Sequence, residues 1–197
     1  MKLAYLIAGV VVLAGGALLW RLFAPAPVMN IGFASFGGQP VVVKAFTLNG
    51  NRSGLFSDMV VDGGGDAPPR TSGSGNHLTS YRKGQGDQIA IDVSWVELAS
   101  GEAWRAAATV SAADLERSAS GAIQILPVFA PGGLLIISSD PLPASDQDQR
   151  VRDLARVCAT RAPDLDQDFR SDPRALPGLW EALQTLSPQP SAQECQS

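Results

Sequence analysis

Seven separate stretches of the chain are rich in apolar residues, many of them β-branched, and in some of them hydrophobic and polar positions alternate; both patterns predict β-strands. The clearest case is residues 88–98, where Ile89, Ile91, Val93 and Trp95 alternate with polar or smaller side chains. Short Gly-, Pro- and Asn-rich segments, such as Asn49-Gly50-Asn51, separate the stretches and predict hairpin turns. We therefore expect an antiparallel sheet or sandwich of about seven strands. The expected strands are residues 28–36, 41–48, 55–61, 88–98, 103–110, 122–129 and 134–139.

The segment 62–88 has a different composition from the strands around it. It contains Gly63-Gly64-Gly65 and alternating Ser and Gly between residues 72 and 75, which do not favour regular secondary structure. A loop of this length within a compact domain is unusual and is often disordered or functional. We expect a long surface loop.

The last fifty residues carry a helical period. Val151, Leu154, Ala155 and Cys158 follow an i, i+3, i+4, i+7 spacing, and a second helical pattern runs from Leu176 to Leu183. These patterns predict two C-terminal helices packed on the sheet. The expected fold class is therefore α+β: a β domain over residues 25–143, with a helical tail over 144–197 that belongs to the same domain.

The first 24 residues predict a transmembrane anchor. Residues 3–20 are uncharged and apolar, and with Leu22 and Phe23 they approach the ~20 residues that cross a bilayer as a helix. A cleaved signal peptide ending at Ala24-Pro25-Ala26 is the alternative. Lys2 and the α-amino group outnumber Arg21, so the positive-inside rule places the N-terminus in the cytoplasm. The expected location is the bacterial inner membrane, single-pass, with the domain in the periplasm.

Composition and charge narrow the function classes. The charged fraction is 17% and the net charge is −4, neither of which suits a nucleic-acid-binding protein. The two cysteines, Cys158 and Cys195, both lie near the C-terminus. In an oxidising compartment they are expected to form a disulfide, whereas the alternative is a buried, unpaired Cys158.

The sequence contains no pattern that compels an enzymatic reading, and we expect no catalytic residues, cofactor, metal or small-molecule substrate. The single histidine, His77, lies in the Gly- and Ser-rich loop, and the chain has no Gly-x-Ser-x-Gly motif. Asp164, Asp166 and Asp168 begin like a calcium-binding loop, but Phe169 stands where that loop requires glycine. We expect a solvated acidic segment there.

The long loop is the expected partner-binding surface. It carries charged and aromatic side chains of the kinds that anchor protein interfaces. A mobile linker with no partner is the alternative. The candidate partner-binding residues are Asp62, Asp66, Arg70, His77, Tyr81 and Arg82.

The order of several short motifs resembles a family of small bacterial envelope proteins, many of them membrane-anchored. The motifs are Thr47-Leu48-Asn49-Gly50, Gly63-Gly64-Gly65, Val93-Ser94-Trp95, the segment from Val128 to Gly133, and Asp140-Pro141. Members of that family are often encoded beside phospholipase effectors of the type VI secretion system. The resemblance implies an immunity protein that binds a secreted lipase and blocks it. The chain departs from the family at Ala67-Pro68-Pro69, where many members have adjacent cysteines. Many members are also lipoproteins, whereas we do not expect this chain to be one.

Two other functions remain open from the sequence. The chain could be a non-catalytic accessory subunit of an envelope or secretion assembly, or a hydrolase that uses His77. An immunity protein would tolerate replacement of the anchor by an unrelated helix, whereas an accessory subunit that assembles through this helix would not. Replacement of His77 would inactivate the hydrolase alone.

Overall fold

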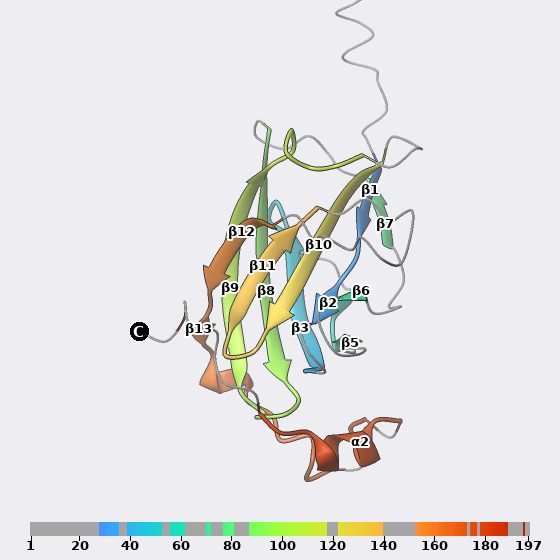
Figure 1. The fold of residues 1–197 in the computed structure, drawn as a ribbon, viewed down its shortest axis with the longest axis vertical. Coiled ribbons are helices and arrows are strands. Elements are labelled where there is room, and N and C mark those ends of the chain that lie inside the picture. Colours follow the sequence, from blue (N-terminus) through green and yellow to red (C-terminus); the bar gives the residue numbers. More distant parts are fainter. Residues whose placement is uncertain are drawn as a thin grey trace, which may run out of the picture.

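The computed structural model describes residues 28–35, 39–52, 56–61, 70–71, 77–80, 87–117, 122–139, 153–172, 174–176, 178–188 and 195. These residues form two β-sheets that pack face to face as a sandwich (Figure 1). A C-terminal segment with one short helix lies at one end of the sandwich, and the first strand begins at the opposite end.

The first sheet, sheet 1, contains seven strands. A row of five runs in the order β12 (Asp153–Cys158), β11 (Leu134–Ser138), β10 (Ile123–Ala130), β1 (Val28–Ile31) and β7 (His77–Ser80). β2 (Ala34–Ser35) continues β1 alongside β10 and pairs with β6 (Arg70–Thr71). Both β1 and β2 run parallel to β10, with Met29 opposite Ile123 and Val128 opposite Ala34.

The second sheet, sheet 2, contains six strands and is antiparallel throughout. Its order is β13 (Thr160–Arg161), β9 (Ala103–Ser111), β8 (Gln88–Glu97), β3 (Val41–Leu48) and β4 (Asn51–Arg52). The short strand β5 (Met59–Val61) also pairs with β3. A register shift between Val43 and Ala45 interrupts the pairing of β3 with β8.

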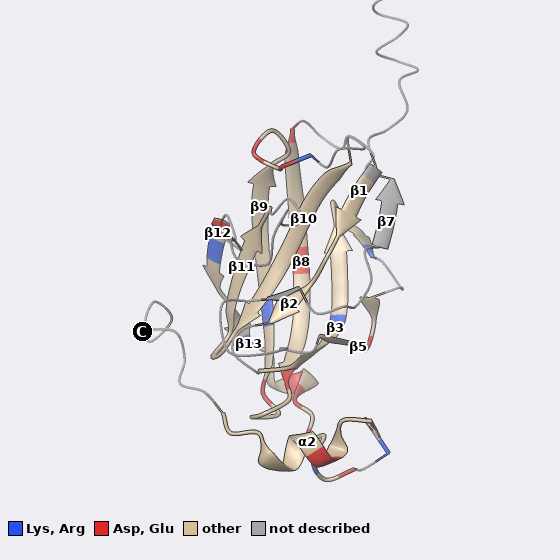
Figure 2. Ribbon diagram, turned by 45° about the vertical axis from the view of Figure 1, so that its right-hand side comes forward, with Lys and Arg blue, Asp and Glu red and all other residues tan. Residues whose placement is uncertain are grey.

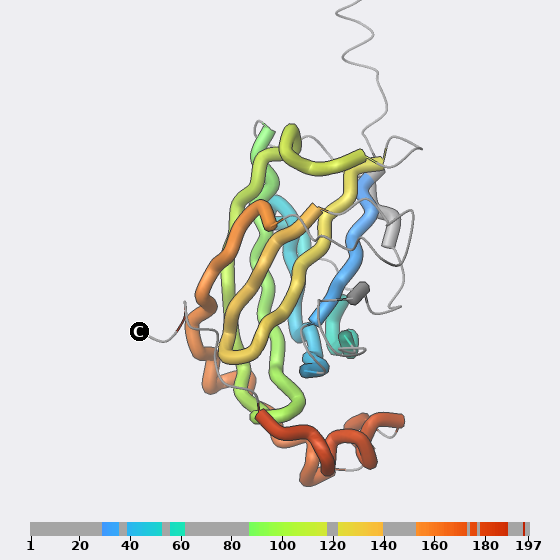
Figure 3. Tube along the Cα trace, viewed as in Figure 1, coloured from blue at the N-terminus to red at the C-terminus, as the bar shows by residue number. Residues whose placement is uncertain are grey.

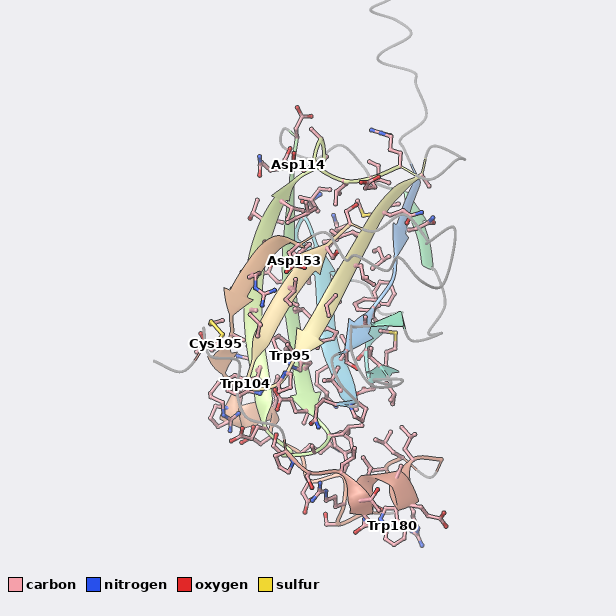
Figure 4. All side chains as sticks on the ribbon, viewed as in Figure 1. Trp95, Trp104, Asp114, Asp153, Trp180 and Cys195 are labelled. Carbon is pink, nitrogen blue, oxygen red and sulfur yellow. A yellow bond between two sulfur atoms is a disulfide. The ribbon has the colours of Figure 1, made fainter. Side chains whose placement is uncertain are left out.

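The main core lies between the sheets. The alternating residues of β8 point into it, ending at Trp95, which lies opposite Trp104 of β9. Phe33 contacts the rings of Phe46 and Phe56, and Trp95 contacts Phe129 across the sandwich with ring centroids 5.1 Å apart. Figure 4 shows the two labelled tryptophans of this region in the lower half of the sandwich. Burial of these large rings stabilises the sandwich because each removes about 150–250 Å² from water.

Strands β10 and β11 are buried on both faces. All eight residues of β10 and all five of β11 are buried, so their sequences are continuous apolar runs and not alternating ones. Their inner side chains join the main core. Their outer side chains form a second apolar cluster, against which Cys195 packs. Figure 2 shows that most of the strand length carries no charge.

The chain passes from one sheet to the other between β12 and β13. β12 pairs with β11 of sheet 1, and β13 pairs with β9 of sheet 2. At the crossing, the Ala159 backbone N–H donates to the Gly133 carbonyl at 2.8 Å. Cys158 at the end of β12 forms a disulfide with Cys195, with the Cα atoms 5.5 Å apart. The tube in Figure 3 shows β12 and β13 closing this edge of the sandwich.

The segment after β13 covers one end of the outer face of sheet 2. It contains the short 3-10 helix η2 (Pro163–Leu165) and the helix α2 (Trp180–Thr185). Phe169 and Leu183 of this segment are buried against Val42, Val96 and Leu98 of the sheet. Gln39, just before β3, donates from Nε2 to the Ser187 carbonyl at 3.1 Å. This hydrogen bond connects the same segment to sheet 2.

The predicted α+β class is wrong, because the described residues are mostly β with one short helix. The helix expected around 151–158 is the strand β12, in which Ala155 and Val157 pack against the core. Ala155, Val157 and Ala159 have the strand period of two, and pairing with β11 overrides the helical period. The second expected helix is shorter than predicted, since Leu176 and Leu179 precede α2 in turns.

Two details of the strand prediction are also corrected. The expectation that all strands pair as antiparallel hairpins is wrong. β1 and β2 pair in parallel with β10, which lies far from them in the sequence. The segment 62–88, expected to lack regular structure, contains β6 and β7.

Among the described residues, no helix has the length and apolar character needed to cross a membrane. The predicted anchor, residues 1–24, lies outside the described part of the chain.

Candidate binding surface

The structure describes only part of the predicted partner-binding surface. Asp62, Asp66, Tyr81 and Arg82 lie outside the described residues. The other two belong to strands of sheet 1: Arg70 of β6 lies opposite Ser35, and His77 of β7 lies opposite Ile31.

An open groove lies on the outer face of sheet 2. It has a volume of about 370 Å³ and crosses strands β3, β8, β9 and β13. This volume is near the lower end of the ~300–1,000 Å³ range of small-molecule sites, so the groove can hold one or two side chains of a partner. Its lining residues are Ala45, Thr47, Asp92, Val93, Ser94, Arg105, Ala106, Ala107 and Thr160.

The strand register builds the groove from two cross-strand rows. In one row Asp92 lies between Thr47 and Ala107. The second row places Ser94 between Ala45 and Arg105, and Arg105 is followed by Thr160 of β13. Alternation in β8 and β9 turns these residues away from the core. Because most of them are small, the face is hollowed where larger side chains would fill it.

The C-terminal segment leaves the groove open. It covers the neighbouring outward-facing residues Val42, Val96 and Ala103, which are buried. Further along the same strands, Asp92 and Ala107 are exposed. The outer face of sheet 2 is thus divided into an apolar half that the C-terminal segment covers and a half of small and polar residues that the described part of the chain leaves uncovered.

The charges around the groove leave one carboxylate without a counter-ion. Arg105 forms an ion pair with Asp164 at 2.7 Å, and Lys44 on the adjoining bulge pairs with Asp58. Asp92 accepts a hydrogen bond from the Thr47 hydroxyl at 3.3 Å, and no described Lys or Arg forms an ion pair with it. Among the described residues, the groove therefore presents one carboxylate that has no ion pair, beside an arginine that is paired with Asp164.

A second polar cluster lies at the turn between β10 and β11 and is buried. The Glu97 carboxylate accepts a hydrogen bond from the Gly133 N–H at 3.1 Å and from the Ser100 hydroxyl at 3.3 Å. Burial raises the pKa of Glu97 above its ordinary value, and the hydrogen bonds from the Gly133 and Gly132 backbone and from Ser100 partly oppose this. Its position is inside the fold, so Glu97 acts as a structural acceptor.

Arg161 organises the surface beside that cluster. Its guanidinium lies 5.1 Å from the ring centroid of Trp104, donates to the Ala103 carbonyl at 2.6 Å and binds Asp166 at 2.9 and 3.0 Å. Asp166 also accepts the Ala103 N–H at 2.7 Å. The hydrogen bond from Arg161, followed by that from Ala103, lowers the pKa of Asp166. This network fixes β13 to β9.

The three aspartates that resemble the start of a calcium loop serve other contacts. Asp164 pairs with Arg105, Asp166 pairs with Arg161, and Asp168 accepts the Arg170 backbone N–H at 3.0 Å. Among the described residues, no group of three or more His, Cys, Asp and Glu side chains is arranged to hold a metal ion. The His77 side chain lies outside the described part of the structure.

The sequence pattern does not predict the groove. The signal that was present is the polar, small-residue face of the strand 88–98, where Asp92 alternates with buried neighbours. Its partners Thr47, Arg105 and Thr160 come from other strands, and only the register brings them together. Comparison with protein-family models, curated proteins and solved structures found no match to this chain.

Proposed function

We propose that this chain is a non-catalytic binding protein of the bacterial envelope, held at the inner membrane by its N-terminal apolar segment with the sandwich in the periplasm. The observation that carries the binding role is the open groove on sheet 2, which exposes Asp92, a carboxylate that forms no ion pair with a described Lys or Arg. A groove of this kind recognises a complementary surface and needs no reacting group. The disulfide between Cys158 and Cys195 favours an oxidising compartment.

The proposed partner is a secreted phospholipase-type toxin, which the chain neutralises by direct binding as an immunity protein. Support for this partner comes from the sequence resemblance, carried by motifs such as Val93-Ser94-Trp95 and the turn at Gly132-Gly133. A toxin that attacks membrane lipid is intercepted most effectively at the membrane. A short tether between residue 24 and the first strand at Val28 raises the local concentration of the inhibitor there.

Capture of the partner tests this proposal. The full chain, with a C-terminal affinity tag, is expressed in its source organism, cross-linked, extracted in detergent and purified, and the bound proteins are identified by mass spectrometry. An unrelated single-pass protein with the same tag is the control. We expect one lipase-like secreted protein in stoichiometric amount, whose lipid hydrolysis the purified chain inhibits.

Two results would overturn the proposal. Recovery of several integral envelope proteins would favour an accessory subunit of an envelope assembly, and the absence of any reproducible partner would remove the toxin. Replacement of residues 1–24 by an unrelated transmembrane helix separates the two functions. Protection against the toxin is expected to survive this replacement, because the binding groove lies in the sandwich.

A further inference from the structure

We propose that the groove on sheet 2 is the docking site for an arginine side chain of the protein partner, with Asp92 as its anchor. This inference rests on the proposed binding function and assigns it a surface and a recognition chemistry. The surface is distinct from the long loop that the sequence favours.

The charge of the groove points to a cationic guest. The nearby basic groups already have carboxylate partners: Arg105, which lines the groove, pairs with Asp164, and Lys44 beside it pairs with Asp58. Among the described residues, the Asp92 carboxylate accepts a side-chain hydrogen bond only from the hydroxyl of Thr47. A cation from the partner supplies the missing counter-ion, and the net charge of −4 on the chain attracts it at longer range.

The shape and the hydrogen-bonding groups favour arginine over lysine. The methyl groups of Ala45 and Ala107 leave the groove open, so a long side chain can lie along it. The acceptors lie in neighbouring positions: the Asp92 carboxylate and the hydroxyl oxygens of Thr47 and Ser94. A guanidinium has five N–H donors in one plane and can reach several acceptors together, whereas an ammonium acts as a point charge.

A protein is the occupant that fits the extent of this surface. The groove is open to solvent, and it lies beside the part of sheet 2 that the C-terminal segment covers with apolar contacts. An anchoring side chain in a small depression, surrounded by a flat sheet face, is the arrangement of a protein interface. A second copy of this chain is the competing occupant, and the concentration dependence of the NMR shifts distinguishes it from another protein.

The recognition chemistry can be measured without knowing the partner. The full chain in detergent micelles, with alanine methyl groups labelled, is titrated with N-acetyl-arginine amide and followed by NMR. The methyl signals of Ala45 and Ala107 report on the groove, and those of the exposed Ala113 and Ala182 serve as internal controls. N-acetyl-lysine amide tests the shape of the cation, and N-acetyl-citrulline amide has nearly the shape of arginine without its charge.

We expect saturable shifts of the groove methyls with the arginine compound, weaker binding of lysine and none of citrulline. D92N should weaken arginine binding by about tenfold or more, because a charge-assisted hydrogen-bonded pair contributes roughly 1.5–3 kcal/mol. D114N, which removes an exposed carboxylate at the end of the sandwich opposite α2 (Figure 4), should leave it unchanged. Non-saturable shifts, or equal binding by wild type and D92N, would overturn the proposal.

A second arm tests docking in the captured complex. D92K should lose the partner that the wild-type chain captures, whereas D114K should retain it. Capture unaffected by D92K would overturn the docking site and leave the immunity function standing. If no partner is captured, the immunity function fails, while the NMR titration still decides whether the groove takes arginine. Groove shifts that depend on protein concentration alone would instead identify a second copy as the occupant and overturn the proposal.

Discussion

The Glu97 carboxylate accepts a hydrogen bond at 3.1 Å from the backbone N–H of Gly133, 36 residues further along the chain. The contact joins the end of β8 in sheet 2 to the turn between β10 and β11 in sheet 1. The same turn packs on Trp104 of β9 and accepts the Ala159 N–H at the crossing between the sheets. This turn therefore connects the two sheets at the closed edge of the sandwich. Each of its contacts can be tested by a separate substitution.

The pH dependence of stability should reveal the burial of Glu97. Because its pKa is raised in the folded state, the folded protein holds this proton more tightly than the unfolded chain. The contribution of Glu97 to stability is therefore full below the unfolded-state pKa and falls as the pH rises through the folded-state pKa. The neutral E97Q variant keeps an acceptor for Gly133 and lacks this loss.

The measurement is the free energy of unfolding of E97Q minus that of wild type, from denaturant titrations between about pH 4 and about pH 8. We expect this difference to rise with pH in favour of E97Q. Taking the difference cancels the other carboxylates, including Asp166, which titrate in both proteins. A difference that stays constant across this range would show that Glu97 titrates with its ordinary pKa.

Alanine at Gly133 should be far more destabilising than alanine at Gly50. Both glycines have positive φ values, +82° and +75°, which cost an L-residue roughly 1–2 kcal/mol. A Cβ at Gly133 would also lie 2.3 Å from the Trp104 ring, whereas a Cβ at Gly50 meets no atom within 4 Å.

We expect G133A to lose about 2–4 kcal/mol and G50A about 1 kcal/mol, measured by denaturant unfolding. The double variant W104A/G133A should recover part of the clash energy, because the ring is absent. Equal losses in G133A and G50A would mean that the turn moves away from Trp104 at no cost.

Removal of the disulfide should lower stability by roughly 3–4 kcal/mol, from the loop-closure entropy of a crosslink between residues 37 apart. The variants are C158A, C195A and the double substitution, with the reduced wild type as a control. All four should unfold at the same denaturant concentration, lower than that of the oxidised protein. A double variant as stable as the oxidised wild type would show that the disulfide does not contribute to the free energy of unfolding.

The Arg161–Asp166 pair predicts a second titration of opposite sign. The pKa of Asp166 lies below its ordinary 3.8, so its contribution to stability is present above the unfolded-state pKa and lost as the pH falls through the folded-state pKa. Carboxyl-carbon NMR should give an Asp166 midpoint below 3.8 in wild type and a higher one in R161Q. An unchanged midpoint would mean that Arg161 does not bind Asp166 in solution.

Much of the sandwich could be predicted from local pattern, because β8 and β9 have one buried and one open face. The helix expected around Leu154 and Ala155 is wrong for a physical reason: the same segment also carries Ala155, Val157 and Ala159 at the strand period of two, and only pairing with β11 decides between the two patterns. The groove could not be predicted, since Thr47, Asp92 and Thr160 meet through register alone.

Inhibition of the captured partner is the most direct test of the immunity function. The lipid hydrolysis of that partner is measured while wild-type chain, D92K or D114K is added in increasing amounts. If the chain neutralises the partner through the groove, wild type and D114K abolish hydrolysis at one equivalent and D92K does not. Full hydrolysis in the presence of excess wild-type chain would contradict the immunity function, whereas equal inhibition by D92K would contradict the assigned groove.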